Sequence, residues 1–372
     1  MNARPQYIDM PVPDSRAESE ARARQLQLTK PPGSLGRLEE LACWFAARTS
    51  NPIPEISHSE IFVFAADHGV ASQGVSAFPQ SVTGQMVANF AGGGAAINVL
   101  AMLEKCPIQV VDVGVASDDE PPPSVRREKV RAGTRDLLVE AAMTDEELTA
   151  ALDVGARCAR EAIQRGAQLL IAGDMGIANT TAAACLICAF TDTMPEQVVG
   201  RGTGVDDAGL ARKREVVTAA LARARKAIVT PDSPSAGTGK AAGTPELPSA
   251  GARKMLAHVG GLEIAAMAGF YIEAARSGVP VLLDGYISGA AALAAVRLEP
   301  CTVRWMLASH RSAEGGHGYA LQALGLNPLV DLGMRLGEGS GAALTLPIIQ
   351  AALALHRNMA TFTSAGVDGK SP

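Results

Sequence analysis

The chain has 372 residues, of which 47% are hydrophobic and 19% charged, and its formal net charge is −5. This composition fits a globular protein with a large core, arranged as one large domain or two unequal domains. The negative charge and the 4% of aromatic residues exclude a basic, base-stacking surface, so we expect no nucleic-acid partner.

The first predicted elements are helices at the N-terminal end of the chain. Residues 14–48 have a helical pattern that places Leu38, Leu41 and Phe45 on one face. The run Lys-Pro-Pro-Gly-Ser-Leu-Gly at 30–36 divides this region into two helices, because proline and glycine interrupt a helix.

Five short apolar runs follow, and none of them alternates with polar residues, which is typical of strands buried on both faces of a parallel sheet. They are 61–66, 108–111, 169–172, 281–283 and 303–308. Helical patterns separate or follow these runs at 81–104, 144–165, 179–190, 206–228, 260–277, 288–296 and 340–362. Gly92-Gly93-Gly94 indicates a break or a close approach of backbone in the first of them, and Thr144 with Glu147 forms a capping box in the second. The alternation of strand and helix predicts βαβ units and an α/β fold.

The chain is expected to form a large α/β domain over 50–335 that contains the active site. A small helical domain would combine 1–49 with 336–372, and residues 230–251, rich in Pro, Ser, Gly and Ala, would form a flexible insertion. No apolar stretch is expected to span a membrane and the N-terminus does not resemble a signal peptide. The six cysteines lie in apolar or helical context, which favours reduced thiols and a cytoplasmic location.

All five predicted strands end in residues that can carry chemistry. The endings are Asp67-His68-Gly69, Asp112-Val113-Gly114, Gly173-Asp174-Met175-Gly176, Asp284-Gly285 and Ser309-His310-Arg311. Because ligands bind at the carboxyl ends of strands in open α/β sheets, these endings predict one composite active site along one edge of the sheet.

Two glycine-rich turns indicate a phosphate ligand. In Gly173–Thr181 a strand ends in a turn, and Asn179 or Thr180 can cap the following helix, whose free N–H groups attract anions. In Gly200–Asp207 three glycines allow an anion-binding nest, and Lys213 can add a positive charge. Each turn alone is equally compatible with an ordinary turn, but two together favour a monophosphate.

A single carboxylate, Glu338, stands between Gly337 and Gly339 and can act as a general base or acid, although the spacing alone favours a carboxylate that stabilises a helix start. The loop 67–79 can line a slot for a flat ring. A weaker alternative gathers Asp67, His68, His310 and His317 into the metal centre of a hydrolase.

Taken together, seven motifs resemble the nicotinate-nucleotide–dimethylbenzimidazole phosphoribosyltransferase family. The motifs begin at Lys30 (KPPGSLGRLE), Ala65 (AADHGV), Gly173 (GDMGIANTT), Gly200 (GRGTG), Gly260 (GGLEIAAMAG), Ser309 (SHRSAE) and Gly337 (GEGSG). They occur in the family's order over nearly the whole chain, which makes the resemblance specific.

The resemblance implies a Rossmann-like parallel sheet, a homodimer, and no metal or cofactor. It implies transfer of the phosphoribosyl group of nicotinate mononucleotide to 5,6-dimethylbenzimidazole with inversion, giving α-ribazole 5′-phosphate for cobalamin lower-ligand synthesis. Glu338 would be the general base, and Asp174, which stands where the family is expected to carry glutamate, would be a second catalytic residue. The implied substrate-binding residues are Phe78, Gln85, Met175, Gly176, Asn179, Thr180, Gly202, Thr203, Gly204, Lys213, Ser309 and Leu336.

Overall fold

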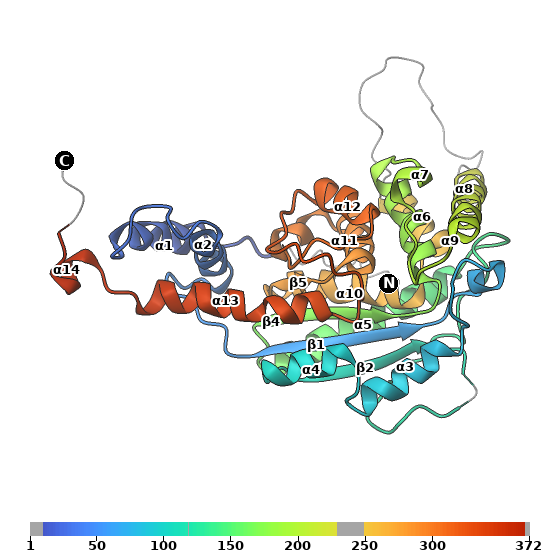
Figure 1. Ribbon diagram of the computed structural model, residues 1–372, viewed down its shortest axis with the longest axis horizontal. Helices are drawn as coiled ribbons and strands as arrows, with labels where there is room; N and C mark the ends of the chain where they lie inside the picture. Colours follow the sequence, from blue (N-terminus) through green and yellow to red (C-terminus); the bar gives the residue numbers. More distant parts are fainter. Residues whose placement is uncertain (1–9, 118, 229–248, 369–372) are drawn as a thin grey trace, which may run out of the picture.

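A parallel sheet of six strands forms the centre of the computed structural model, which describes residues 10–117, 119–228 and 249–368 (Figure 1). The strands are β1 (Ser59–Ala66), β2 (Ile108–Gly114), β3 (Arg126–Arg127), β4 (Leu169–Met175), β5 (Val281–Leu283) and β6 (Met306–Ala308). Their order across the sheet is β3-β2-β1-β4-β5-β6. Because β1 pairs with both β2 and β4, the direction of strand order reverses between β1 and β4. The predicted α/β fold with a parallel sheet is confirmed.

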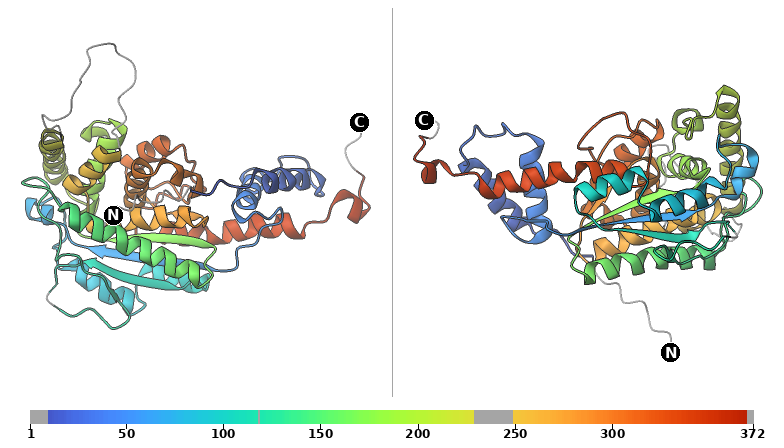
Figure 2. Two further views of the ribbon diagram at one scale, coloured as in Figure 1. Left: turned by 180° about the vertical axis from the view of Figure 1, so that it is seen from behind. Right: turned by 60° about the horizontal axis from the view of Figure 1, so that its bottom comes forward.

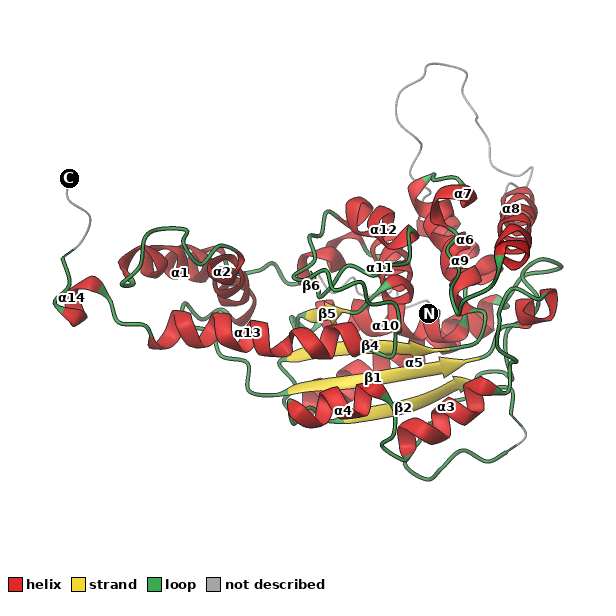
Figure 3. Ribbon diagram, in the orientation of Figure 1, coloured by secondary structure: helices red, strands yellow, loops and turns green. Residues whose placement is uncertain are grey.

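Helices cover both faces of the sheet (Figure 3). Alternate residues of β1 point to opposite faces: Ile61 and Val63 enter one core, while Phe62 and Phe64 enter the other. The first core contains α2 (Arg37–Thr49), α3 (Val82–Ala91), α4 (Ala96–Leu103) and α13 (Ser340–Asn358) as far as Leu353. The second contains α5 (Asp145–Gln164), α6 (Asn179–Thr191), α8 (Asp207–Ile228), α9 (Ser249–Val259), α10 (Leu262–Arg276), α11 (Tyr286–Leu298) and α12 (Gly316–Leu324).

The helices α5 and α10 pack with their backbones in direct contact, on the face seen from behind (Figure 2, left). A Cβ atom on Gly155 of α5 would overlap the carbonyl group of Ala266, and one on Gly269 of α10 would overlap that of Leu152. Glycine is therefore required at both crossing points. This packing explains part of the high glycine content, which covers 38 residues.

A helical unit from both ends of the chain extends from one end of the sheet (Figure 1). The helices α1 (Ser15–Gln27) and α2 (Arg37–Thr49) pack against each other, and α2 also packs against α13. The guanidinium group of Arg24 donates hydrogen bonds of 2.9 Å to the carbonyl groups of His356 and Arg357. The other end of α13 belongs to the core of the sheet through Ala343 and Leu346. The division into two domains stays a prediction.

Several predicted elements have different bounds in the structure. The run 303–308 forms only the three-residue strand β6, because residues 300–305 form the 3₁₀ helix η2 (Pro300–Trp305). The helix predicted at 340–362 ends at Asn358, and α14 (Phe362–Ala365) follows. The 3₁₀ helix η1 (Gly69–Gln73), α7 (Pro195–Val198), α9, α12 and β3 were not predicted. Of the insertion predicted at 230–251, residues 230–248 lie outside the described residues and 249–251 begin α9.

Two predictions on the helical region at 81–104 have different outcomes. The break predicted at the glycine cluster is confirmed, since α3 ends at Ala91 and α4 begins at Ala96. The segment Val82–Leu103 is long and apolar enough to cross a membrane by length and composition, contrary to the sequence-based expectation. The interruption leaves helices of 10 and 8 residues, and each is shorter than the roughly 20 residues that a membrane span needs.

Candidate active site

A cavity of about 430 Å³ lies at the carboxyl edge of the sheet, where the strand order reverses. Six parts of the chain line it: Phe78 with the first half of α3, the turn between β4 and α6, the turn at Gly202 and Thr203, the start of α11, the loop after β6 and the segment 335–338. A parallel α/β sheet binds ligands at this position, because the loops that follow neighbouring strands meet there. The ends of β4, β5 and β6 meet at this cavity, whereas Asp67 after β1 and Asp112 of β2 line a separate cavity, so three of the five predicted strand ends share one site.

Ten of the fourteen site residues inferred from the sequence line this cavity. They are Phe78, Asp174, Met175, Gly176, Asn179, Thr180, Gly202, Thr203, Leu336 and Glu338. The apolar part also includes Val82, Met86 and Ile177. Phe78 and Leu336 are 52% and 58% exposed, so the cavity has apolar side chains at its surface that a flat ring could cover.

Glu338 lies in an unusual backbone turn immediately before α13. Its φ of +66° stands between values of +86° at Gly337 and +87° at Gly339, and positive φ is unfavourable for a residue with a side chain. The turn packs directly on the end of β4, where a Cβ atom on Gly173 would overlap the Glu338 carbonyl group. The surrounding structure thus holds Glu338 in a strained conformation.

The Glu338 carboxyl group is buried, with the residue 5% exposed, and its Oε2 atom finds no hydrogen-bond partner among the described residues. Burial raises the pKa of this group above its ordinary value, the backbone N–H of Ile97 lowers it, and the charge of Asp284 raises it. A carboxylate with an unused oxygen and a raised pKa is suited to accept a proton.

Asp174 is a second buried carboxyl group in the same cavity. It lies near the end of β4, is 7% exposed, and accepts a hydrogen bond of 2.9 Å from Nδ2 of Asn179. Burial, followed by the charges of Asp284 and Glu263, raises the pKa of Asp174 well above its ordinary value. Burial and these neighbouring charges therefore favour the protonated form of Asp174.

Besides these two buried carboxyl groups, the site contains a buried amino group, that of Lys213 on α8. Its Nζ atom lies 2.6 Å from Oγ1 of Thr180, and a Cβ atom on Gly202 would come within 2.9 Å of Nζ. The side chain is buried, and this burial lowers the pKa of Lys213 to about 8, against the opposing effect of Glu314. Lys213 does not line the cavity itself but contacts Thr180, which does.

The start of α6 differs from the predicted arrangement. Neither Asn179 nor Thr180 caps the helix, because the N-cap residue is Ala178, with φ of +72° and no side-chain hydrogen bond. The two polar side chains are used elsewhere, on Asp174 and Lys213 respectively. The helix N-terminus borders the cavity, but the N–H groups of Asn179 and Thr181 already donate hydrogen bonds to the carbonyl groups of Gly176 and Ala178. Only part of the first turn can therefore offer donors to an anion.

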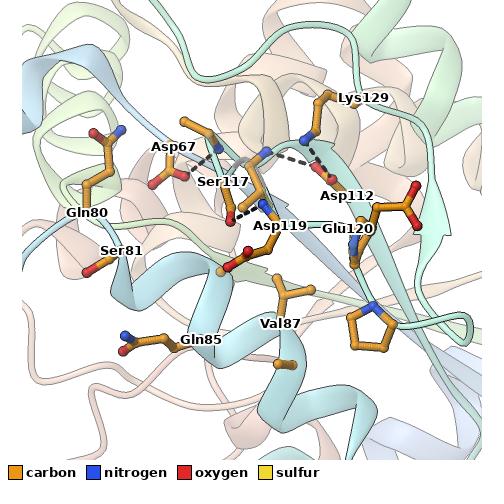
Figure 4. A pocket seen from close by; sticks show the side chains of 16 residues that line it. Asp67, Gln80, Ser81, Gln85, Val87, Asp112, Ser117, Asp119, Glu120 and Lys129 are labelled. Carbon is orange, nitrogen blue, oxygen red and sulfur yellow. Dashed lines mark hydrogen bonds and ion pairs between the residues drawn. The ribbon is translucent and has the colours of Figure 1, made fainter.

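Gln85 does not line the cavity that contains Glu338. On α3 it shares a side with Ser81 and Ala88, and these three residues line a separate cavity of about 450 Å³, whereas Val82 and Met86 face Glu338's cavity. The separate cavity also contains Asp67, Asp112 and Asp119 (Figure 4). The assignment of Gln85 to the ring slot stays a prediction, and in this structure Gln85 lies on the side of the helix that faces the neighbouring cavity.

Two further residues inferred from the sequence lie beside the cavity rather than on its surface. Oγ of Ser309 is buried and donates a hydrogen bond of 3.4 Å to the carbonyl group of Asp284. Gly204, with φ of +103°, lies in the turn that follows Thr203. Neither is among the lining residues.

The structure does not gather the side chains of the alternative metal centre. His68 pairs with Glu263 at 2.6 Å, fully buried, and Asp67 lines the separate cavity. Nδ1 of His317 accepts a hydrogen bond of 2.9 Å from the backbone of Ser312. Within the described ranges no three His, Cys, Asp or Glu side chains come together as metal ligands. This hydrolase alternative is not supported.

Several residues of the site were not selected from the sequence. Tyr286, Glu314 and Arg335 line the cavity, and Arg335 donates a hydrogen bond of 3.0 Å to the carbonyl group of Gly202. Asp284 lies behind the Glu338 turn. The sequence marks Asp284 only by its position directly after a predicted strand. No feature of the sequence pattern predicts the contact between Arg335 and the Gly202 turn.

Comparison with known proteins gives consistent results. A family model described as Phosphoribosyltransferase matches residues 10–367. The nicotinate-nucleotide–dimethylbenzimidazole phosphoribosyltransferase of Chromobacterium violaceum is 56% identical, over 96% of this chain and 98% of its own. The protein of the same name from Bradyrhizobium sp. strain BTAi1 is 49% identical, over 98% and 97% of the two chains. A crystal structure of this enzyme from Thermus thermophilus has a TM-score of 0.85 and 45% identity, covering 96% of this chain and all of its own.

Proposed function

The chain belongs to the phosphoribosyltransferase family of these relatives, and we propose that it transfers the phosphoribosyl group of nicotinate mononucleotide to 5,6-dimethylbenzimidazole. The products are α-ribazole 5′-phosphate, used for the lower ligand of cobalamin, and nicotinate. The observation that carries this proposal is one cavity with an apolar lining, a buried carboxylate at Glu338, and a buried cation at Lys213 beside Thr180.

In the proposed reaction a ring nitrogen of the benzimidazole attacks the anomeric carbon of the ribose. The bond from that carbon to the pyridinium nitrogen of nicotinate breaks, and nicotinate leaves with the electron pair. Glu338 takes the N–H proton of the benzimidazole, so that the new nucleotide carries no extra positive charge. Attack from the face opposite the leaving group inverts the anomeric carbon. The buried, partly unsatisfied carboxyl group of Glu338 supports its role as the base.

The phosphate is proposed to bind where the turn at Gly202 and Thr203 meets the start of α6. Lys213 supplies the positive charge there, and the N–H group of Thr180 at the start of α6 supplies a donor. Asp174 is proposed to face the ribose as a protonated acid, able to donate a hydrogen bond. The apolar side chains Phe78, Met86 and Leu336 are proposed to contact the benzimidazole ring.

The test is nicotinate release from nicotinate mononucleotide, with and without 5,6-dimethylbenzimidazole, followed by chromatography of the nucleotide products. Release that requires the acceptor and yields an α-linked ribotide supports the transferase. Release without the acceptor would indicate a hydrolase, and absence of release under both conditions would contradict catalysis on this nucleotide.

We also propose that the protein is a homodimer in the cytoplasm. The helix α4 exposes Val99, Met102 and Leu103, and such a group of apolar side chains favours a protein contact. All six cysteines are unpaired and five are buried, which supports a reducing compartment. Light scattering should give twice the chain mass for the wild type and a lower mass for a Met102→Asp, Leu103→Asp variant. A wild-type monomer would contradict the dimer.

A further inference from the structure

Asp284 connects the end of β5 to the turn that carries Glu338. It follows β5 directly and is 1% exposed. Its Oδ2 atom accepts a hydrogen bond of 3.1 Å from the backbone N–H of Gly339, and its Oδ1 atom accepts one of 3.1 Å from that of Ala342. Both oxygens thus act as acceptors toward the first turn of α13. Burial raises the pKa of Asp284, whereas His310 and these backbone N–H groups lower it and favour the ionised form.

The start of α13 depends on this external partner. The N-cap residue is Gly339, which has no side chain to accept the free N–H groups of the first turn. On the β4 side the turn packs against Gly173 so closely that a Cβ atom on this glycine would overlap the Glu338 carbonyl group. The Glu338 turn is therefore held between β4 and β5, and Asp284 supplies the polar contacts on the β5 side.

Other side chains fix Asp284 in turn. Its backbone N–H donates a hydrogen bond of 3.0 Å to Oγ of Ser288, and that hydroxyl group lies 2.8 Å from the hydroxyl group of Tyr271. Nδ1 of His310 lies 3.9 Å from Oδ1 of Asp284 and 3.1 Å from Oγ of Ser309. These contacts hold the backbone of Asp284 after β5, and His310 borders its carboxylate.

We propose that Asp284 is a positioning residue for Glu338. Asp284 holds Glu338 in its strained turn through two accepted hydrogen bonds, and its carboxylate places a negative charge next to the base. The proposal rests on the proposed function, in which Glu338 accepts the acceptor's proton. Asp284 itself does not line the cavity, so it acts through the turn and not by contact with substrate. Without its two accepted hydrogen bonds, the three consecutive residues with positive φ can relax and move the carboxyl group of Glu338.

The groups that face Glu338 come from four elements. They are Asp174 at the end of β4, Asp284 after β5, His310 after β6, and the backbone N–H of Ile97 on α4. Asp284 is a negative neighbour, and it raises the pKa of Glu338. Removal of this charge should lower the pKa of Glu338, so the base would stay ionised to lower pH and the acidic limb of the kcat profile would move to lower pH.

The experiment combines Asp284→Asn with Glu338→Gln and measures acceptor-dependent nicotinate release. Asparagine keeps the shape but turns one acceptor into a donor, so one of the two bonds to α13 is lost. We expect Asp284→Asn to lower kcat by about 10- to 100-fold and to change the KM for nicotinate mononucleotide by less than about twofold. In the Glu338→Gln background the further loss should be below about threefold, because the base is already absent.

A matched control is Glu60→Gln, which alters a buried carboxylate at the opposite edge of the sheet, where it pairs with Arg165 at 2.6 Å. Its effect on kcat should be small and equal in both backgrounds. Asp284→Glu keeps the charge but displaces it, so it should lower kcat while leaving the acidic limb at the wild-type pH.

The positioning role would be overturned if Asp284→Asn lowered kcat by the same factor in the wild type and in the Glu338→Gln variant. It would also be overturned if the acidic limb of the kcat profile of Asp284→Asn stayed at the wild-type pH. Failure of both Asp284 variants to fold would also overturn it, since the residue would then serve the whole fold and not one turn. Absence of acceptor-dependent release by the wild type would instead refute the proposed function, so the two failures are distinguishable.

Discussion

The buried Lys213 gives a prediction whose magnitude can be worked out from its surroundings. Burial lowers the pKa of its ammonium group from 10.5 to about 8 in the free protein. This shift corresponds to about 3 kcal/mol of unfavourable free energy for the charged form. Since the charged form is needed to bind a phosphate, nucleotide binding should be lost as the pH rises through about 8.

The expected change follows from the fraction of Lys213 that carries a proton. This fraction is about nine-tenths at pH 7 and about one-tenth at pH 9, so kcat/KM for nicotinate mononucleotide should fall about tenfold between these values. The phosphate does not interfere, because its second pKa is about 6 and it is already a dianion. The assay is initial-rate nicotinate release at a saturating, fixed concentration of acceptor.

Two controls separate Lys213 from other titrating groups. Lys213→Gln should lower kcat/KM by about 10- to 100-fold at pH 7, the scale of a lost charge-assisted hydrogen bond, and should abolish the alkaline limb. Nicotinate riboside, which lacks the phosphate, should show no alkaline limb with the wild type. If the limb persists with Lys213→Gln or with the riboside, Lys213 does not bind the phosphate in the assigned way.

Three further predictions concern the buried groups around the cavity. Glu338→Gln should keep the unfolding temperature but reduce turnover by about 100-fold or more, and near-normal turnover would remove Glu338 from the role of base. Gly173→Ala should reduce turnover by about 100-fold with a smaller effect on nucleotide affinity, because the added methyl group displaces the Glu338 turn; a changed affinity with unchanged turnover would contradict this. Glu263→Ala leaves His68 buried without its partner and should lower the free energy of unfolding by about 3–5 kcal/mol in urea titrations, whereas a loss below about 1 kcal/mol would show that the pair contributes little.

The sheet was predictable from the sequence because burial on both faces leaves a clear pattern in β1, β4 and β5. The strand at 303–308 was predicted too long, since an apolar run does not reveal that Pro300 starts a 3₁₀ helix. The helix α12 was missed because it begins at Gly316, a residue with low helix propensity, and packing of its Ala320 and Leu321 outweighs that cost.

The candidate site was predictable as a set of strand ends and glycine turns, but not in its detailed contacts. The sequence does not say which cavity Gln85 faces, because sequence spacing gives the periodicity of α3 but not the rotation of the helix about its axis. Asp284 was visible only as one of several strand-end carboxylates. Its bonds to Gly339 and Ala342 join positions more than fifty residues apart in the chain, and no local pattern encodes such a pairing.

The packing of α2 on α13 has a consequence for synthesis on the ribosome. The apolar face of α2, with Leu41 and Phe45, is covered by α13, which follows roughly 300 residues later. At a synthesis rate of about 5–20 residues per second, α13 is made about 15–60 s after α2. During this interval the apolar face of α2 lacks the cover that α13 gives it in the folded protein, so we expect the unfinished chain to expose this face until α13 has been made.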